Sequence, residues 1–573
     1  MAAAKGENTS PTNSGILPAV EWRRPSEFLG TEVQPRIFEG RIEPSDIVQG
    51  QLGDCWLLCA LASVANHEQL IKELVPESEC NPAMGLYVTR LCKDGEWKKV
   101  LLDSYIPCTP KAGPIYAKAG KGELWVSLLE KAFAKYNGSY AAIRSGWIHE
   151  ALIDLTGAPF KEFCLDDGSC EKIILDGSLW DRMKRYSSLN YIMAVSTPGV
   201  DHITEGGGTR RGGGLVPGHA YSLLKVQESK DGKHKLCKVR NPWGQYEWTG
   251  DWSDKSPLWT EAYKEEFGLC DSDNGIFWMP FDLLVADFHA IVVSMVRRPS
   301  LNTVSWKEER KKLTYKFSHE AHGVESVQMY KLIIAGNGAE LYATVHQQDK
   351  RKIGSPLYFD IGVTILKETS IKGEYKFIGS SGNAVDRQHQ LEVPTGSLPQ
   401  GTYILVATST GCKIENERRN IIASGKSLTP ADVTRSAVIS VHCDQLVLMQ
   451  EIAFDPVTYE QAIKMPIMAK GEQTDLFGDG SVILYTLKSG YNGNSYVAEN
   501  KKTDEYAKLE MDFSNSTNIV TEDGDLNASL VIGPGQSRII HHVMPADDHL
   551  SWNCKWSVKG ALLTEEQFKA AQI

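Results

Sequence analysis

The chain changes its secondary-structure pattern at residues 297–300 (RRPS), and this change limits the folds that it can adopt. Before that point, helical stretches such as 123–136 (ELWVSLLEKAFAKY) alternate with short strands such as 235–240. After it, short apolar runs rich in β-branched residues are separated by Gly, Pro and Asn turns, a pattern typical of β-sandwiches. The sequence therefore predicts a mixed α and β half followed by a β half. The runs that indicate strands in the first part of the β half are 330–335, 341–346, 402–407 and 437–442.

A second β-rich block is predicted from about residue 451 onward. Its strands are expected at 482–488, 507–513 and 529–532, with a short closing helix at 564–571. A length of 573 residues also favours several domains, because single hydrophobic cores stop growing beyond roughly 250–300 residues. The chain is therefore expected to contain more than one domain.

Charge and cysteine content narrow the class of protein. Sixty-one Lys and Arg against 72 Asp and Glu give a net charge of −11, which disfavours nucleic acid as a partner. Twelve scattered cysteines without a dense block fit free thiols in a reducing compartment. The first residues lack the apolar stretch of a signal peptide, and no apolar run reaches the roughly 18 residues needed to span a bilayer. We expect a cytoplasmic protein that begins with a short disordered tail.

A glycine-punctuated turn that opens into an apolar helix is the sharpest local signal. It reads QGQLGDCWLLCALA from Gln49 and places Cys55 in the first turn of the helix. A thiol at this position feels the positive end of the helix dipole and the unpaired backbone N–H groups, which lower its pKa and favour the nucleophilic thiolate. A buried structural cysteine is the alternative. This motif alone does not decide between the two roles.

A thiolate nucleophile needs a base, and a histidine stands where a glycine-rich stretch enters a strand. The segment PGHAYSLLKV carries His219, and the next strand ends in VRNPWG with Asn241 at the start of a turn. The Asn241 amide is expected to hold the imidazole through Nδ1, and Trp243 to shield that bond from water. A lone histidine is more often structural. The order Cys55, His219, Asn241, however, is that of papain-type Cys-His-Asn proteases and favours catalysis.

Gln49 is the candidate for stabilising a developing negative charge. It stands six residues before Cys55, and its amide N–H₂ can join the Cys55 backbone N–H as an oxyanion hole. Its alternative role is that of a surface turn residue.

Three segments taken together resemble the catalytic motifs of the calpain family: QGQLGDCWLLCALA, GHAYSLLKV and VRNPWGQYEWTGDW. The resemblance extends over about residues 22–298 and includes LWVSLLEKAFAKYNGSY and NGIFWMPF. It implies an α+β, papain-like protease core over 22–300, in two lobes of about 22–165 and 166–300. Cys55 would lie on the first lobe and His219 and Asn241 on the second, with the cleft between them.

The resemblance also assigns the remaining segments. Residues 301–450, notably GTYILVATST, resemble the C2-like β-sandwich that follows the core in calpains. Residues 451–573 match less closely and are expected to form a second sandwich-like domain with its closing helix. The expected fold is thus a two-lobed core, preceded by a disordered tail over 1–21 and followed by all-β, C2-like sandwich domains.

Calcium is the cofactor that the resemblance implies, with one ion in each lobe of the core. Calcium takes six to eight oxygen ligands. In the first lobe Asp46 matches a family ligand, but the acidic position after NGSY is Ala141. In the second lobe Glu247 and Asp254 match. The family's acidic run there reads Asn274-Gly275-Ile276 and has lost two carboxylates, with Asp271 and Asp273 close by as substitutes. Calcium activation through the core therefore stays an open hypothesis.

The sequence also bears on two further partners, the conventional calpain small subunit and phospholipid. No stretch fits the EF-hand pattern, so the chain resembles atypical calpains and is not expected to bind the conventional small subunit. The mixed-sign run KEERKK at 307–312 is usually a solvated face. Peripheral contact of the sandwich with phospholipid is the alternative interpretation of that run.

The function predicted is that of a cytoplasmic cysteine endopeptidase, which cleaves protein substrates at few sites through a thioester acyl-enzyme. A transglutaminase or amidase uses the same Cys-His pair with an acidic third member, and Asn241 argues against it. A non-proteolytic scaffold, in which the sandwiches bind partners or membrane, is the alternative from another class.

Overall fold

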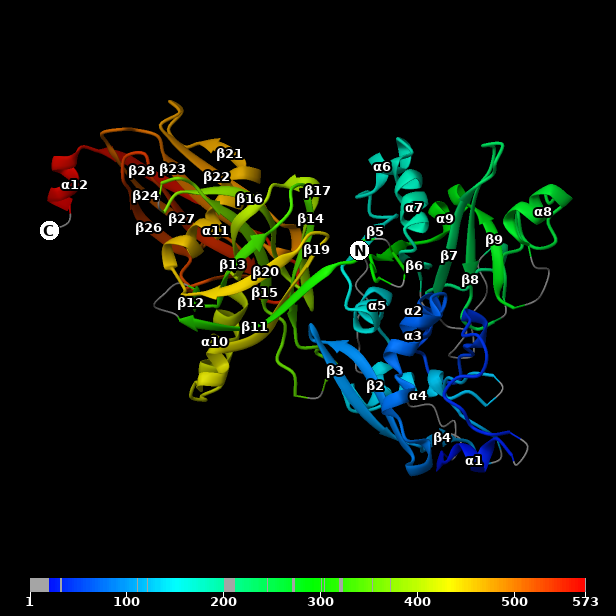
Figure 1. Ribbon diagram of the computed structural model, residues 1–573. Helices are drawn as coiled ribbons and strands as arrows, with labels where there is room; N and C mark the ends of the chain where they lie inside the picture. The colour runs from blue at the N-terminus through cyan, green and yellow to red at the C-terminus, as the bar shows by residue number, and fades with distance from the viewer. Residues whose placement is uncertain are drawn as a thin grey trace. The chain divides into compact units, whose positions relative to one another are not determined.

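Helices and strands alternate along the first half of the chain, and strands dominate the second half (Figure 1). The computed structural model describes residues 20–571 except 31–32, 111, 121, 200–211, 245, 270–273, 300, 303, 319–322, 353 and 372. The chain divides into two units, one formed by Met1–Ser305 with Arg351–Ile353, and one by Trp306–Lys350 with Gly354–Ile573. Within the described residues, no helix combines the length and the apolar character needed to cross a membrane.

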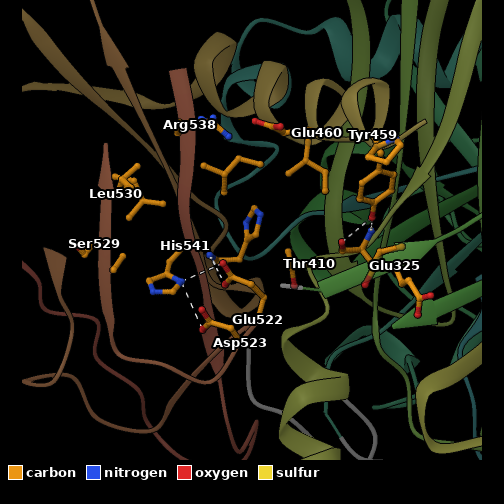
Figure 2. A pocket seen from close by; sticks show the side chains of 18 of the residues that line it. Glu325, Thr410, Tyr459, Glu460, Glu522, Asp523, Ser529, Leu530, Arg538 and His541 are labelled. Atoms are coloured by element: carbon orange, nitrogen blue, oxygen red, sulfur yellow. Dashed lines mark hydrogen bonds and ion pairs between the residues drawn. The ribbon is translucent and has the colours of Figure 1, made fainter. Parts of the chain in front are cut away.

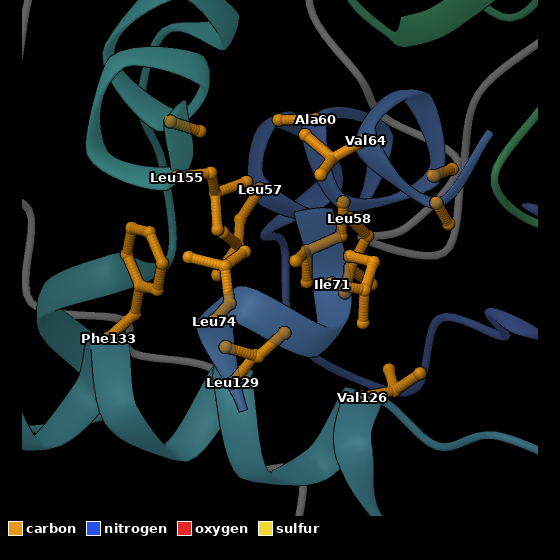
Figure 3. Packing of buried hydrophobic residues seen from close by; sticks show 14 of the residues in the cluster. Leu57, Leu58, Ala60, Val64, Ile71, Leu74, Val126, Leu129, Phe133 and Leu155 are labelled. Carbon is orange, nitrogen blue, oxygen red and sulfur yellow. The ribbon is translucent and has the colours of Figure 1, made fainter. Parts of the chain in front are cut away.

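The first lobe of the first unit is built around a helix that is buried on all sides. Helix α2 (Cys55–Ala65) has ten buried residues out of eleven, and Figure 3 shows Leu57 and Leu58 against side chains of the surrounding helices. Each fully buried leucine stabilises the fold by about 1.5–3 kcal/mol, so the start of α2 is held firmly. The other elements of this lobe are β1 (Glu21–Arg23), α1 (Pro25–Phe28), α3 (Glu68–Leu74), β2 (Leu86–Lys93), β3 (Glu96–Asp103), β4 (Ile106–Cys108), α4 (Trp125–Asn137) and α5 (Ile148–Thr156).

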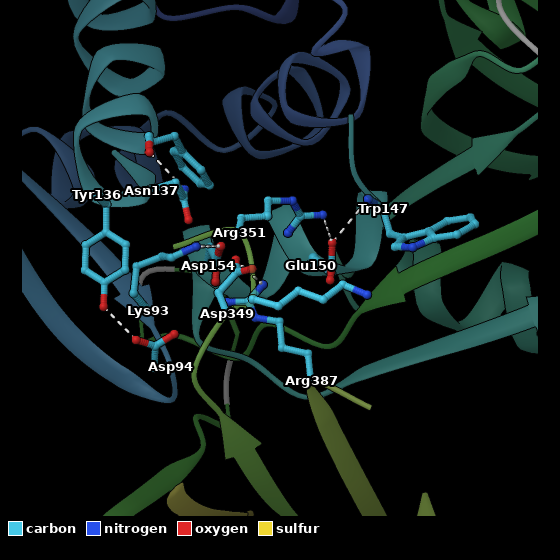
Figure 4. Close-up of polar contacts among 12 residues, drawn as sticks. Lys93, Asp94, Tyr136, Asn137, Trp147, Glu150, Asp154, Asp349, Arg351 and Arg387 are labelled. Atoms are coloured by element: carbon cyan, nitrogen blue, oxygen red, sulfur yellow. Dashed lines mark hydrogen bonds and ion pairs between the residues drawn. The ribbon is translucent and has the colours of Figure 1, made fainter. Parts of the chain in front are cut away.

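A buried ion pair joins strand β2 to helix α5 in this lobe. Lys93 Nζ lies 2.7 Å from Asp154 Oδ2, and both side chains are almost completely buried (Figure 4). The ammonium also faces the rings of Phe133 and Tyr136 at 5.5 and 5.3 Å. The pair has a partner for each charge, as buried charges require.

The second lobe is an antiparallel six-stranded sheet in the order β5-β10-β6-β7-β8-β9. Its apolar face adjoins α2, because Ala194 of β6 and Ala220 of β7 belong to the same buried core as the helix. The lobe consists of β5 (Phe160–Cys164), α6 (Glu171–Leu175), α7 (Ser178–Ser188), β6 (Ile192–Ser196), β7 (Ala220–Glu228), β8 (Lys235–Arg240), α8 (Glu261–Phe267), β9 (Ile276–Pro280), α9 (Phe281–Asp287) and β10 (Ala290–Ser294).

The second unit begins with two five-stranded antiparallel sheets, β12-β11-β19-β14-β17 and β16-β15-β18-β13-β20. Alternate residues of their strands share one apolar core, as expected of a sandwich. The elements are β11 (Lys307–Ser318), β12 (Gly323–Ser326), β13 (Met329–Ile334), β14 (Ala339–Gln347), β15 (Asp360–Glu368), β16 (Tyr375–Val385), β17 (Gln388–Leu398), β18 (Gly401–Thr408), α10 (Cys412–Ala423), β19 (Thr434–Cys443), β20 (Val447–Ile452) and α11 (Pro456–Lys470).

The last part of the second unit has a five-stranded sheet, β21-β22-β23-β27-β25, and a three-stranded sheet, β26-β24-β28. Residues from both sheets form a separate apolar core. The elements are β21 (Glu472–Asp475), β22 (Val482–Lys488), β23 (Asn494–Asn500), β24 (Tyr506–Asp512), β25 (Ile519–Thr521), β26 (Asn527–Ile532), β27 (Ser537–Pro545), β28 (Ser557–Leu563) and α12 (Glu565–Ala571).

The structure differs from the sequence-based expectations in two places. The β half is not all-β, because it contains the helices α10 and α11. The expected boundary between the lobes at residue 165 falls after β5, but β5 pairs with β10 and so belongs to the sheet of the second lobe. The charged run at 307–312 forms the first half of β11 and pairs with β19, and none of its six residues is buried, as expected of a solvated face.

Candidate active site

Cys55 is the first residue of α2, as the sequence predicts, and it is partly exposed. The Leu57 and Leu58 N–H groups donate to the carbonyl of Asp54, at 2.9 and 3.1 Å, and so define the helix start. One turn further on, Cys59 is completely buried, and burial raises its pKa to about 12. Of these two neighbouring thiols, only Cys55 has the position and exposure of a nucleophile.

His219 is held at the entrance of β7 by its own backbone. Its N–H donates to Thr197 Oγ1 at 3.0 Å, and its carbonyl accepts from the Thr197 N–H at 3.0 Å. The Thr197 hydroxyl in turn donates to the Val216 carbonyl at 2.6 Å. The histidine is 1% exposed. These bonds lock the backbone from which the imidazole projects.

The Asn241 amide bonds the imidazole, but at the other nitrogen from the one expected. His219 Nε2 lies 2.9 Å from Asn241 Oδ1, and the Trp243 N–H donates to the same oxygen at 3.0 Å. Asn241 Nδ2 donates to the Tyr246 carbonyl at 3.3 Å, which fixes the direction of the amide. The prediction of a bond at Nδ1 is therefore wrong. Because Oδ1 only accepts, Nε2 carries the hydrogen, and Nδ1 is the nitrogen that can exchange a proton with a thiol.

Trp243 connects the base to the candidate oxyanion residue. Its ring lies 4.3 Å from the His219 ring, centroid to centroid, and its Nε1–H donates to Gln49 Oε1 at 2.7 Å. An indole N–H is only a donor, so this bond fixes which end of the Gln49 amide is oxygen. Gln49 Nε2 donates one hydrogen to the Leu52 carbonyl at 2.8 Å and has a second hydrogen to give.

The two lobes meet behind these residues through direct bonds. Ser222, three residues after His219, donates its hydroxyl to the carbonyl of Cys59 at 3.1 Å. Arg240, which precedes Asn241, is 1% exposed and donates from Nη2 to the Ile47 carbonyl at 3.2 Å. Burial lowers the pKa of Arg240 to about 10. Helix α2, which begins with Cys55, and strand β7, which follows His219, are therefore joined by a hydrogen bond.

Two residues that hold backbone groups near the site, Thr197 and Glu130, lie outside the three catalytic motifs of the sequence. Thr197 gives no local signal, because its role depends on contact with a residue 22 positions away. Glu130 does give one, since it is a carboxylate within the apolar pattern of 123–136. A buried acid in such a helix indicates a partner across the core.

Two of the carboxylates proposed for calcium, Asp46 and Glu247, accept hydrogen bonds from backbone N–H groups. Asp46 Oδ2 accepts the Glu43 N–H at 2.7 Å, and Glu247 Oε1 accepts the N–H groups of Asn274 and Gly275 at 3.0 and 2.8 Å. Across the described ranges, no three His, Cys, Asp or Glu side chains form a group that could hold a metal ion.

Asp254, the third carboxylate proposed for calcium, is half-buried in the turn that follows Trp252. Asp271 and Asp273, the expected substitutes, lie outside the described residues. The observed role of Glu247 is structural, because it holds the turn whose Gly275 carbonyl accepts the Asn241 N–H at 2.8 Å.

A cavity of about 650 Å³ lies in the second unit and contains no catalytic set (Figure 2). His541 Nδ1 lies 3.1 Å from Glu522 Oε1 in its wall, and Glu522 Oε2 accepts the His542 N–H at 2.8 Å. Burial lowers the pKa of His541, but the hydrogen bond and charge of Glu522 outweigh it and the net shift is upward. These groups neutralise one another within the wall.

Comparison with known proteins agrees with a two-lobed cysteine hydrolase. The calpain family cysteine protease domain matches residues 6–295, and a calpain-D-like C-terminal domain matches residues 466–565. The first match covers half of the chain and contains every residue of the candidate site. The chain belongs to the calpain family of cysteine proteases.

Individual relatives agree with this family. The calpain-type cysteine protease DEK1 of Zea mays is 39% identical over 289 residues, which is 49% of this chain and 13% of that protein. The calpain-type cysteine protease ADL1 of Oryza sativa is 39% identical over 423 residues, 68% of this chain and 19% of that protein. Calpain-5 of Mus musculus is 32% identical over 318 residues, 51% and 49% of the two chains. The chain spans less than half the length of each of these relatives.

Proposed function

We propose that the protein is a cysteine endopeptidase in which Cys55 is the nucleophile, His219 the general base and acid, and Asn241 the residue that orients His219. The observation that carries this proposal is the bonded series from Asn241 through His219 and Trp243 to Gln49, six residues before Cys55. A base fixed at one ring nitrogen, beside an amide that still has a hydrogen to donate, is what acyl transfer requires.

The reaction proceeds in two halves. Cys55 Sγ attacks the scissile carbonyl carbon, and the thiol proton passes to Nδ1 of His219 while Nε2 stays bonded to Asn241. The oxyanion accepts hydrogen bonds from the Cys55 backbone N–H and from the second hydrogen of Gln49 Nε2. His219 then gives its proton to the departing amine, which leaves a thioester. Water attacks the thioester, His219 takes the proton of that water, and Cys55 departs as the thiolate.

Trp243 serves the same chemistry in two ways. Its ring covers the His219 side of the bond to Asn241, which keeps water from competing for that bond. Its indole N–H holds the Gln49 oxygen away from the position of the oxyanion. A reversed amide would present an oxygen to a negative charge and oppose the reaction.

The setting of this activity is proposed from the sequence. Limited cleavage of other proteins in the cytoplasm fits the scattered free thiols and the family. The conventional small subunit is not an expected partner. Contact of the first sandwich with phospholipid stays a prediction. The side chains that would make this contact are those of Lys307, Lys311 and Lys312. Arg310 is not available for it, since its side chain is only 12% exposed and bonds Glu308.

Casein hydrolysis by the full chain tests the proposed function. We expect Cys55→Ala to lose activity by at least about 10⁴-fold, because no other thiol stands at the helix start. Cys59→Ala is the matched control, one turn along the same helix, and is expected to remain active.

Each protein is assayed with calcium and with chelator. The calcium hypothesis is tested in the same assay: loss of activity in chelator would support ligation by Asp46, Glu247 and Asp254, and equal activity with calcium and with chelator would contradict it. Equal activity of Cys55→Ala and the parent would contradict the proposed nucleophile. Inactivity of the parent in every condition would favour the scaffold.

A further inference from the structure

The first unit contains a short segment from far along the chain, Arg351–Ile353, although β14 before it and β15 after it belong to the second unit. The arginine of this segment carries a permanent positive charge. Arg351 Nη2 bonds a carboxylate oxygen of Glu150, the third residue of α5 (Figure 4). The two side chains are only 15% and 9% exposed, so solvent screens this ion pair weakly.

The same guanidinium lies over the ring of the residue that follows the nucleophile. Arg351 Cζ is 4.8 Å from the centroid of the Trp56 ring, within the range of cation–π attraction. Trp56 is 3% exposed, and its indole N–H donates to the Ile143 carbonyl at 3.0 Å. Arg351 Nε donates to the Ser145 carbonyl at 3.4 Å. The guanidinium therefore contacts both the Trp56 ring and the loop to which that ring is bonded.

Arg351, Trp56 and this loop are packed together without free space. A Cβ atom on Gly146 would come within 2.7 Å of Arg351 Nη2 and of two atoms of the Trp56 ring. Only glycine fits at this position, because a side chain would displace the ring or the guanidinium. Loss of the guanidinium would in turn leave a gap beside the Trp56 ring.

The loop at 143–146 contacts the chain on both sides of Cys55. After Cys55, it accepts the hydrogen bond of the Trp56 indole. Before Cys55, Gly53 packs against it, since a Cβ atom there would lie 3.2 Å from the Arg144 carbonyl oxygen. Gly53 and Trp56 flank the turn in which α2 begins. A shift of the loop would therefore move Cys55 and the backbone N–H proposed for the oxyanion hole.

Glu150 connects the guanidinium to α2 by a second path. Its Oε2 also accepts the Trp147 N–H at 3.3 Å, which closes the first turn of α5. Helix α5 packs against α2. Arg351 thus reaches the start of α2 through Trp56 and reaches the side of that helix through α5.

We propose that Arg351 is a positioning residue for Cys55. Its guanidinium, held by Glu150, fixes Trp56 and the adjoining loop, and these keep the thiol and the backbone N–H of Cys55 in place for attack. Arg351 acts through these neighbours and is no catalytic residue. The role rests on the proposed function, so the tests are chosen to tell the two apart.

A lysine at this position separates positioning from simple stabilisation. Arg351→Lys keeps a positive charge opposite Glu150 but lacks the planar guanidinium over Trp56 and the bond to the Ser145 carbonyl. Arg351→Gln lacks the charge as well. If Arg351 only stabilised the fold through its charge, lysine would restore both stability and activity. If it positions Cys55, lysine restores stability alone.

The first test measures kcat, KM and the melting temperature of the full chain, with a peptide substrate and at a temperature where every variant is folded. In Arg351→Gln we expect kcat to fall about tenfold with KM little changed, because the nucleophile is displaced while the contacts with substrate remain. The melting temperature should fall as well. Arg351→Lys should melt close to the parent but keep a several-fold loss in kcat.

Lys352→Gln is the matched control. Lys352 is the next residue of the same segment, and its Nζ lies 5.3 Å from the centroid of the Tyr136 ring on α4. The kcat of this variant should equal that of the parent. The inference is overturned by a parent-like kcat in Arg351→Gln, by recovery of kcat in Arg351→Lys, or by an equal loss in Lys352→Gln.

The second test measures the binding of two inhibitors, the aldehyde and the alcohol of the same peptide, by calorimetry. Cys55 Sγ adds to the aldehyde carbon and the thiol proton passes to the aldehyde oxygen, so tight binding of the aldehyde needs a positioned thiol. The alcohol binds without reacting. In Arg351→Gln the aldehyde should bind about tenfold more weakly, with the affinity for the alcohol unchanged. An equal loss of affinity for both would contradict positioning.

The two tests separate failure of the inference from failure of the proposed function. If the parent cleaves the peptide and Arg351→Gln keeps both its kcat and its preference for the aldehyde, the inference is wrong and the proposed function stands. If the parent neither cleaves the peptide nor prefers the aldehyde, the proposed function fails and positioning fails with it. The melting temperatures then still report the ion pair of Arg351 with Glu150.

Discussion

The two lobes of the first unit hold their reacting groups by different means. In the second lobe, His219 is fixed by neutral hydrogen bonds to Thr197 and Asn241. In the first lobe, the helix that begins with Cys55 packs on α5, which the buried ion pair of Lys93 with Asp154 joins to β2. Neutral bonds keep their strength as pH changes, whereas buried ionisable groups do not. The comparison indicates that a buried charge pair stabilises the lobe with the nucleophile, whereas neutral bonds hold the backbone from which His219 projects.

The largest effect should come from breaking the ion pair of the first lobe. Lys93→Met keeps the packing against Phe133 and Tyr136 but leaves Asp154 buried without its cation. We expect a loss of about 3–5 kcal/mol in the free energy of unfolding, measured by denaturant titration.

Lys98→Met serves as the control on the neighbouring strand, where Lys98 pairs with Glu96 at 3.0 Å near the surface. Lys98→Met should lower the free energy of unfolding by at most about 1 kcal/mol. If Lys93→Met and Lys98→Met lowered the free energy of unfolding by similar amounts, the buried pair would stabilise the lobe no more than the exposed pair does. The comparison would then fail.

The next effect concerns the contact between the lobes at Gln49. Gln49→Ala removes one donor of the proposed oxyanion hole, and we expect kcat to fall about 10²–10³-fold with KM little changed. Steady-state kinetics on a peptide substrate checks this. A change confined to KM would show that Gln49 binds substrate and does not stabilise the transition state.

Trp243→Phe sharpens this prediction, because it keeps a ring over His219 and removes only the indole N–H that orients Gln49. Its loss should be smaller than that of Gln49→Ala. In the double variant with Gln49→Ala, Trp243→Phe should lower kcat little further, because there is then no Gln49 amide for the indole N–H to orient. Full additivity of the two losses would mean that they act independently.

The smallest effect is expected in the neutral lobe. Thr197→Val preserves the shape of the side chain but leaves the His219 N–H and the Val216 carbonyl without their partner. We expect a loss of about 1–3 kcal/mol in stability that is the same at acid and alkaline pH, measured by denaturant titration at both. A loss that grows with pH would contradict the division between a neutral and an ionisable lobe.

Local pattern was enough to predict much of the fold. The strands at 235–240 and 482–488 were predicted to the residue, because each has a marked apolar pattern bounded by turn residues. The helix α11 was missed, since it has no strong apolar face and contains Pro466 in its interior. The run at 307–312 was not predicted as a strand, because it contains no apolar residue and the buried residues of that strand, Leu313 and Tyr315, come only afterwards.

The residues proposed for the site were predictable, but their bonds were not. Cys55, His219, Asn241, Gln49 and Trp243 each stand in a recognisable motif. The contact of Trp243 with Gln49 spans 194 positions, and that of Ser222 with the Cys59 carbonyl spans 163. Such contacts depend on tertiary packing, which no local spacing encodes. The nitrogen of His219 that Asn241 bonds was mispredicted for the same reason.

The burial of most thiols has a practical consequence for covalent labelling. Of the eleven free cysteines in the part of the chain that the structure describes, seven are buried, and the partly exposed ones are Cys55, Cys80, Cys164 and Cys554. Burial raises the pKa of Cys80, and that of Cys164 to about 11, which slows their reaction with electrophiles at neutral pH. A mild alkylating reporter should therefore mark Cys55 and Cys554 in preference to the other described cysteines. In a purified Cys554→Ser variant, the remaining label would follow occupancy of the cleft at Cys55 without a substrate.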